Sequence, residues 1–104
     1  IAPTAALASM PYTPRESMAV ARHFFDDIGS TLWGRYGFVD AFNAGKNWRA
    51  AGNLAIDQGP IAIMIENHRS GLLWNLFMSC VEVKLGLRRL DFEIAPAPTR
   101  AALS

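Results

Sequence analysis

This chain has little of several features that would classify a protein quickly. Its 104 residues include one cysteine, which excludes an internal disulfide and leaves the redox compartment open. Charged residues make up 18%, below the usual share of about 25%. With a net charge of +1, the chain has no electrostatic surface suited to nucleic acid. It shows neither a basic and apolar signal-peptide pattern nor an apolar run long enough to cross a bilayer.

Apolar residues, by contrast, are abundant. They make up 51% of a chain that can form one domain at most, and a domain of this size leaves much of its surface exposed. We therefore expect part of this apolar surface to face a missing part of a larger fold or a partner. The start at Ile1, without a methionine, also favours a fragment or a processed product.

Helical signals dominate both ends of the chain, and we expect an all-α fold of three to four helices. A short helix is predicted over 3–10, stopped by Pro11. A longer helix begins with Thr13 as N-cap, Pro14 in the first turn and Glu16 completing a capping box. Its predicted apolar stripe consists of Met18, Ala21, Phe25, Ile28 and Leu32, and Gly29 can end it early.

A long structured loop is predicted between these helices and the next. Glycines punctuate it at positions 34, 37, 45, 52 and 59, and residues 38–42 favour a very short strand. Loops of this length inside a compact region are usually functional or firmly tied down, so we expect the site here.

Gly59 and Pro60 are predicted to open a second long helix that Gly71 kinks or splits. Apolar residues occupy both of its faces, so both should be covered. One more helix is predicted over 81–93, followed by a disordered tail around Pro96 and Pro98.

Four polar side chains carry the candidate chemistry. Asp40 lies between apolar neighbours, where capping loop amides and binding a ligand are equally favoured. Asp57 and Gln58 precede the predicted helix start, so capping is the preferred interpretation and ligand binding the alternative. Glu66 interrupts an apolar helix, where an ion pair with Arg69 and a ligand contact are equally favoured.

Aromatic and amide side chains complete the set. Rings that stack on C–H surfaces beside amides and carboxylates that bind hydroxyls suit a sugar, and the candidates are Tyr36, Asn43 and Trp48. Rings are more often core than platform, with Trp48 the least core-like. His68 is interpreted as a core histidine. The cluster of His23, Asp26 and Asp27 is predicted to be a solvated face, and we expect no metal and no cofactor.

The chain resembles the C-terminal portion of the bacterial glycoamylase-like domain, the putative glucoamylase and endo-β-1,2-glucanase family. The resemblance rests on four segments: APTAALASMPYTPRES (2–17), YGFVDAFN (36–43), NW (47–48) and LAIDQGPIAIMIENHRSGLLWNLFM (54–78). It implies a fragment of an (α/α)6 barrel whose cleft binds glucan, in a periplasmic or secreted protein.

Two departures limit the resemblance. The family favours tyrosine at His68, and it tends toward Asn-Pro-Glu where this chain has Cys80, Val81 and Glu82. We therefore expect residues 1–79 to be the C-terminal portion of the glycoamylase-like domain and residues 80–104 to be a divergent helix and a disordered tail. A twelve-helix barrel also needs a missing N-terminal part of the same domain as partner.

The resulting hypothesis is a glycoside hydrolase acting on β-1,2-glucan or a related glucan. Such hydrolysis needs two carboxyl groups, and the resemblance implies that at least the general acid lies upstream. The isolated chain should then be inactive and contribute a cleft wall. The cleft-wall residues would be Tyr36, Asp40, Asn43, Trp48, Asp57, Gln58 and Glu66. The alternatives are a non-catalytic helical carbohydrate-binding or interaction module, and a degenerate fragment.

Overall fold

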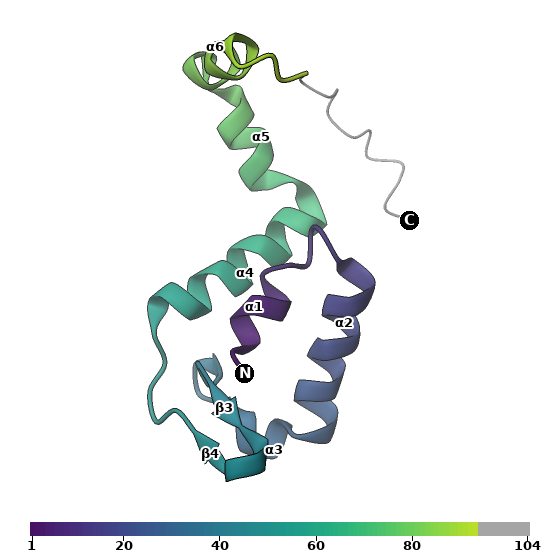
Figure 1. Cartoon of the computed structure of the whole chain (residues 1–104), viewed down its shortest axis with the longest axis vertical. Coiled ribbons are helices and arrows are strands. Elements are labelled where there is room, and N and C mark those ends of the chain that lie inside the picture. Colours follow the sequence, from purple (N-terminus) through teal and green to yellow (C-terminus); the bar gives the residue numbers. More distant parts are fainter. Residues whose placement is uncertain (94–104) are drawn as a thin grey trace. The chain divides into compact units, whose positions relative to one another are not determined.

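A computed structural model describes residues 1–93 and divides the chain into two compact units, one covering Ile1–Ser70 and one beginning at Gly71. The disordered tail predicted around Pro96 and Pro98 lies outside the described residues. The first unit contains the helices α1 (Pro3–Leu7), α2 (Pro14–Arg22), α3 (Gly29–Leu32) and α4 (Ala55–Ser70), and the strands β1 (Trp33–Gly34), β2 (Gly37–Phe38), β3 (Phe42–Asn43) and β4 (Trp48–Arg49) (Figure 1). A π-helical turn (His23–Asp27) and a 3-10 turn (Ala44–Lys46) join them, and the second unit contains α5 (Leu72–Ser79) and α6 (Val81–Arg89).

The core of the first unit lies where the end of α2 meets two small hairpins. Helix α1 packs against both α2 and α4, and Figure 1 shows it between them. Phe24 meets Phe38 and Phe42 edge-on, with ring centroids 6.1 and 5.4 Å apart. Leu7 and Leu32 complete the buried cluster. Few side chains thus form this core, and they come from α1, the π-helical turn, α3 and both hairpins.

The predicted apolar stripe is confirmed in part: Leu32 belongs to the buried cluster and Ala21 and Ile28 pack against it, but Met18 and Phe25 do not. Met18 and Phe25 are exposed, whereas Ser17 and Phe24 are buried. Helix α1 packs on α2, and the small side chain of Ser17 permits a close approach there. The hairpins then select Phe24 rather than Phe25, because Phe24 faces Phe38 and Phe42.

The start of α2 is confirmed, but its capping box is wrong. The helix begins at Pro14 after Thr13, as predicted. Thr13 makes no side-chain cap; its hydroxyl lies 3.3 Å from the Ser9 carbonyl oxygen and 3.1 Å from the Ser17 hydroxyl. The Thr13 side chain therefore connects the preceding turn, through Ser9, to the Ser17 hydroxyl of α2. It does not accept from a backbone N–H in the first turn of α2, as an N-cap would.

The predicted loop contains two hairpins in place of one short strand. Strands β1 and β2 pair antiparallel, with Trp33 opposite Phe38, and β3 pairs with β4, with Phe42 opposite Arg49. The two phenylalanines assigned to one strand thus belong to two hairpins. Asn47 has φ 47°, a left-handed conformation that asparagine tolerates and that lets the chain return after three helical residues.

Helix α4 begins earlier than predicted, at Ala55, so Pro60 lies inside it. Tertiary hydrogen bonds to Asn53, Leu54 and Gln58 fix this start, as described below. The expected coverage of both α4 faces is not found among the contacts of the described residues: Asn67 is buried, but Ile63 remains exposed. No helix in the described part of the chain is long and apolar enough to cross a membrane.

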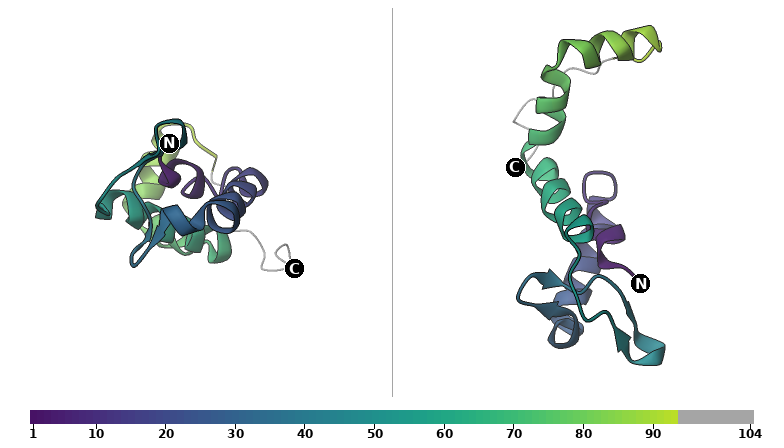
Figure 2. Two further views of the ribbon diagram at one scale, coloured as in Figure 1. Left: turned by 90° about the horizontal axis from the view of Figure 1, so that it is seen from below. Right: turned by 90° about the vertical axis from the view of Figure 1, so that its left-hand side faces the viewer.

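The second unit begins where Gly71 separates α4 from α5. Gly71 has φ 69°, which a residue with a Cβ rarely adopts, and this settles the predicted kink in favour of a split. Helix α6 ends at Arg89, not at 93, because Asp91 turns left-handed and the N–H of Phe92 bonds the Leu87 carbonyl at 3.0 Å. This closure is a Schellman motif. Figure 2 shows the helical course of α5 and α6 from two further directions.

Candidate functional site

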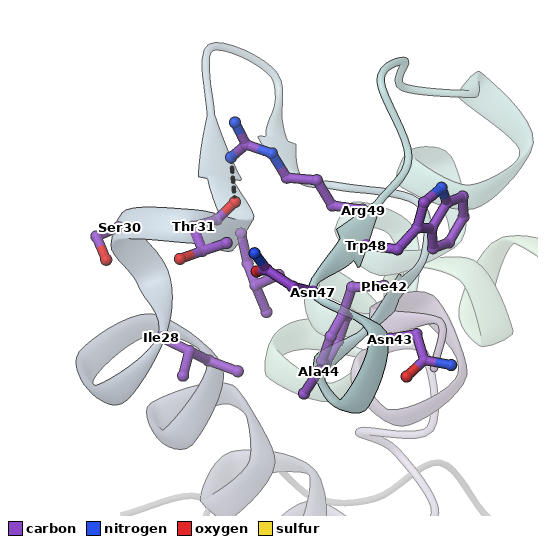
Figure 3. Close-up of a pocket in the computed structure, with 10 residues that line it drawn as sticks. Ile28, Ser30, Thr31, Phe42, Asn43, Ala44, Asn47, Trp48 and Arg49 are labelled. Carbon is purple, nitrogen blue, oxygen red and sulfur yellow. Dashed lines mark hydrogen bonds between the residues drawn. The ribbon is translucent and has the colours of Figure 1, made fainter.

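The β3–β4 hairpin presents two candidate residues together on its outer face. Asn43 and Trp48 are directly opposite each other in the register, so their side chains share one face. Both are exposed, the tryptophan at 54% of its surface. In Figure 3 both side chains extend away from Thr31. The pair offers an indole face beside an amide, as stacking on a sugar ring and bonding its hydroxyls would require.

A hollow of about 540 Å³ is lined by residues of this hairpin and of α3. Phe42 and Arg49 are opposite each other on the other face of the hairpin. Arg49 reaches across the hollow, where its Nη1 donates to the carbonyl oxygen of Thr31 at 2.6 Å (Figure 3). Its lining is formed by Ile28, Ser30, Thr31, Leu32, Phe42, Asn43, Ala44, Asn47, Trp48 and Arg49.

Asp40 and Gln58 meet at the junction between β2 and α4. Asp40 is 8% exposed, and its two carboxylate oxygens accept from the Leu54 N–H at 2.7 Å and from Gln58 Nε2 at 3.1 Å. Gln58 Nε2 and Asn53 Nδ2 both donate to the Phe38 carbonyl, at 2.7 and 2.9 Å. The capping interpretation of Asp40 thus has a structural basis, since this carboxylate ties the loop to the start of α4.

The remaining three candidates lie apart from these pairs. Asp57 is half-buried in the first turn of α4, where the helix dipole favours a carboxylate. Tyr36 is 65% exposed at the β1–β2 turn, with the Arg35 guanidinium 5.3 Å from its ring centroid. Glu66 accepts from Arg69 Nη1 at 2.8 Å, which is the ion pair that the spacing allowed.

Asp57 differs from the other candidate carboxylates in its contacts. Asp40 and Glu66 are engaged with groups of the chain itself. The carboxylate of Asp57 accepts no hydrogen bond from the described residues of the chain. It is consequently the acidic candidate whose oxygens are available to a ligand.

Sequence reasoning missed the residues of the hollow, chiefly Thr31, Asn47 and Arg49. Thr31 belongs to α3, and only the fold brings it to the hairpin. A signal for Asn47 existed, because asparagine after Gly45 and Lys46 is typical of a left-handed turn position. Arg49 carried no signal beyond its neighbour Trp48.

The predicted solvated face is confirmed, because His23, Asp26 and Asp27 are all exposed. His23 and Asp27 form an exposed pair, 2.6 Å between Nδ1 and Oδ2, on the solvated side of the π-helical turn. Among residues 1–93, no group of three or more metal-ligating side chains is found. His68 is half-buried, and Cys80 is exposed.

Comparison with known proteins places this geometry in context. The family model Glycoamylase, described as putative glucoamylase, matches residues 1–81. An exo-β-1,2-glucooligosaccharide sophorohydrolase (non-reducing end) from Parabacteroides distasonis is 50% identical over 91 residues, which cover 88% of this chain and 13% of that protein.

Two solved structures are similar in both fold and sequence. The endo-β-1,2-glucanase from Chitinophaga pinensis, in complex with sophorotriose and glucose, superposes with a TM-score of 0.86 at 56% identity and covers 90% of this chain. A putative glucoamylase from Bacteroides uniformis gives a TM-score of 0.83 at 59% identity over 86% of this chain. The present chain spans only 22% of each of these two structures.

Proposed function

This chain belongs to the glycoamylase family, and from that membership we propose that it is part of a glycoside hydrolase acting on β-1,2-glucans, to which it contributes one wall of the sugar-binding cleft. The relatives whose names state an activity act on β-1,2-glucans or their oligosaccharides. Because the chain spans 13 to 22% of the relatives described above, the wall is its contribution and the complete activity belongs to the whole domain.

The observation that carries this proposal is the exposed Asn43–Trp48 pair. An indole left half-exposed on a two-residue strand adds little to the core, whereas it can stack on the C–H face of a glucose unit. Asn43 lies directly opposite and supplies both a donor and an acceptor for hydroxyls. Tyr36, on the neighbouring hairpin, offers a second exposed ring.

We assign the polar candidates different parts in this wall. Asp57 binds sugar hydroxyls through its carboxylate, which accepts no hydrogen bond from the described residues. Glu66 binds them through the accepting capacity of its carboxylate that the bond from Arg69 does not use. Asp40 and Gln58 reach a sugar only at the edge of their junction, because most of their hydrogen-bonding capacity is used between β2 and α4. At least the general acid comes from a part of the domain outside this chain.

The same assignment covers the fold and its division. We propose that the helices of residues 1–79 are part of an (α/α)6 barrel. Residues 80–104 form a divergent end whose described part is α6. The exposed apolar side chains on α4, of which Ile56 is 79% exposed, support this arrangement because they would be covered by further helices of the barrel.

The direct test measures turnover and binding separately. This chain and a chimaera in which it replaces the matching part of the Chitinophaga pinensis endo-β-1,2-glucanase are assayed on β-1,2-glucan. We expect the chimaera to release oligosaccharides and the chain alone to release none. Turnover by the chain alone would refute the claim that the general acid lies outside this chain. An inactive but folded chimaera would refute the proposed contribution of the chain to the cleft.

The wall itself is tested by single substitutions in the chimaera. Trp48→Ala should raise KM about tenfold, which corresponds to about 1.4 kcal/mol of lost binding, and Trp48→Phe should retain much of the affinity. Phe25→Ala is the matched control, because Phe25 is equally exposed but lies on the π-helical turn. Equal KM values for Trp48→Ala and Phe25→Ala would refute the assignment of Trp48 to the sugar-binding wall.

A further inference from the structure

The hollow between α3 and the β3–β4 hairpin adjoins the proposed sugar wall, because its lining includes Asn43 and Trp48. The register places Phe42 and Arg49 on one face of the hairpin and the Asn43 and Trp48 side chains on the other. Figure 3 shows Arg49 and Asn47 directed toward Thr31, and Trp48 directed away from it. Arg49 and Asn47, and not Trp48, are therefore the side chains directed across the hollow.

The hollow has the size and the mixed lining of a small-molecule site. Its volume of about 540 Å³ lies within the range of roughly 300–1,000 Å³ that such sites occupy. Ile28, Leu32 and Phe42 give it an apolar floor, and Leu32 and Phe42 are buried parts of the core. The floor is consequently preformed and fixed by the core of this unit.

Its polar groups are available to a ligand. The hydroxyls of Ser30 and Thr31 and the amide of Asn47 make no side-chain hydrogen bond to other described residues. Arg49 uses Nη1 on the Thr31 carbonyl at 2.6 Å, which fixes the guanidinium over the hollow and leaves its other N–H donors open. This hydrogen bond already orders the Arg49 side chain, so a ligand that binds it loses less binding free energy to ordering the side chain.

The charge of the lining selects the ligand. Of the ten lining residues, Arg49 carries a positive charge and none is acidic. Guanidinium N–H groups only donate, so the strongest partner for this site is an oxyanion that accepts from Arg49, Asn47 and a hydroxyl together. A neutral hydroxyl could accept from Arg49 but would form no ion pair with it.

We propose that this hollow binds a small organic acid, with a carboxylate or phosphate group on Arg49 and Asn47 and its carbon skeleton on Ile28, Leu32 and Phe42. Charged sugars such as a hexuronate or a sugar phosphate have the required chemistry. The site adjoins the proposed glucan wall, but the groups assigned to the acid, Arg49 and Asn47, are not among the residues assigned to the wall.

Calorimetric titration of this chain with glucuronate, glucose 6-phosphate, inorganic phosphate and glucose tests the proposal. Either organic acid should bind at least about tenfold more tightly than glucose, because a hydrogen bond to a charged group contributes more than one tenfold step. Added salt should weaken that binding. Binding of phosphate alone would indicate an anion site without the apolar floor and would overturn the organic-acid assignment, as would equal affinity for glucose.

Substitutions place the binding in the hollow. Arg49→Gln should weaken the organic acid at least about tenfold, while Arg22→Gln makes the same change of charge on α2 and should leave it unchanged. Asn47→Gly removes the amide from a position with φ 47°, which glycine adopts without strain, so this variant keeps the hairpin. Asn47→Gly should lower the affinity for the organic acid severalfold.

The same variants separate this proposal from the glucan proposal. Tyr36→Ala should leave the affinity for the acid unchanged, since Tyr36 lies at the turn of the β1–β2 hairpin and does not line the hollow. If Arg49→Gln and Asn47→Gly both bind the acid as the unchanged chain does, the site is refuted, whatever the result with β-1,2-glucan. If Trp48→Ala fails to affect glucan, only the wall is refuted.

Discussion

At the scale of single residues, the junction around Asp40 shows how one buried carboxylate fixes the position of others. It joins the loop to the start of α4 through the Leu54 N–H and Gln58 Nε2. Asp57, the carboxylate available to a ligand, lies between these two partners in the sequence. A carboxylate engaged mainly with the chain itself can therefore decide where a sugar-binding carboxylate lies.

Replacing Asp40 by asparagine should destabilise the first unit by about 1–3 kcal/mol. The new amide nitrogen would face a donor, either the Leu54 N–H or Gln58 Nε2, so one buried bond is lost and a donor is left unsatisfied. Urea unfolding followed by circular dichroism measures the loss. Asp26→Asn, at an exposed position on the π-helical turn, should stay within about 0.5 kcal/mol, and equal effects of both would contradict the role of Asp40.

Gly37 is the second residue on which this junction depends. Its φ of 99° is rarely adopted by other residues, and a Cβ there would lie 3.2 Å from Gln58 Oε1. Gly37→Ala should lower the free energy of unfolding by about 1–3 kcal/mol. Gly52→Ala is the matched control, because nothing lies within 4 Å of a Cβ at Gly52. The same measurement should show Gly52→Ala as neutral or slightly stabilising, and a similar loss for both variants would show that Gly37 is replaceable.

At the scale of elements, short pieces tied together by side chains replace long regular ones. Each strand has two residues, too few for independent stability, and each hairpin is held by contacts to a helix. Phe38 and Phe42 pack against Phe24, and Arg49 bonds the Thr31 carbonyl. The hairpins can therefore hold the Asn43–Trp48 pair in place although they are minimal.

The break between α4 and α5 is an element-scale feature that one residue controls. Gly71 has φ 69°, and a Cβ there would lie 3.3 Å from Asn75 Nδ2. Gly71→Ala should oppose the left-handed turn by about 1–2 kcal/mol and favour a continuous helix. If the helix becomes continuous, far-ultraviolet circular dichroism should show increased helicity. If the break persists under strain, hydrogen exchange should show faster amide exchange near residue 75. Gly86→Ala, inside α6 with open space around it, should stabilise its helix without affecting the break.

At the scale of the whole molecule, the described part of the chain leaves more large apolar side chains exposed than its core buries. Among residues 1–93 the buried hydrophobic cluster has five members, whereas large apolar residues remain exposed on α4, α5 and α6, including Ile56, Ile63, Leu76 and Phe77. Such surface is typical of a piece whose neighbours are absent. The chain also spans only 22% of the larger glucoamylase-family structures that it resembles, which has the same physical meaning.

We expect the isolated chain to bind a hydrophobic dye and to self-associate as its concentration rises. Fluorescence of 8-anilinonaphthalene-1-sulfonate and sedimentation velocity measure the two effects. Ile56→Lys together with Ile63→Glu would reduce both while leaving the core cluster unchanged, since neither isoleucine belongs to it. A monodisperse chain with no dye binding would instead favour an independent carbohydrate-binding module.

The sequence by itself determined the helical character, the family and the start of α2, because these depend on local propensity and on residue identity. It did not determine the burial of Phe24 in place of Phe25, the two hairpins or the early start of α4. Those depend on which apolar side chains meet and on which backbone groups a distant carboxylate satisfies. Only the tertiary structure decided that Asn43 and Trp48 face one side of a hairpin and Arg49 the other, because pairing register assigns faces and no local preference does.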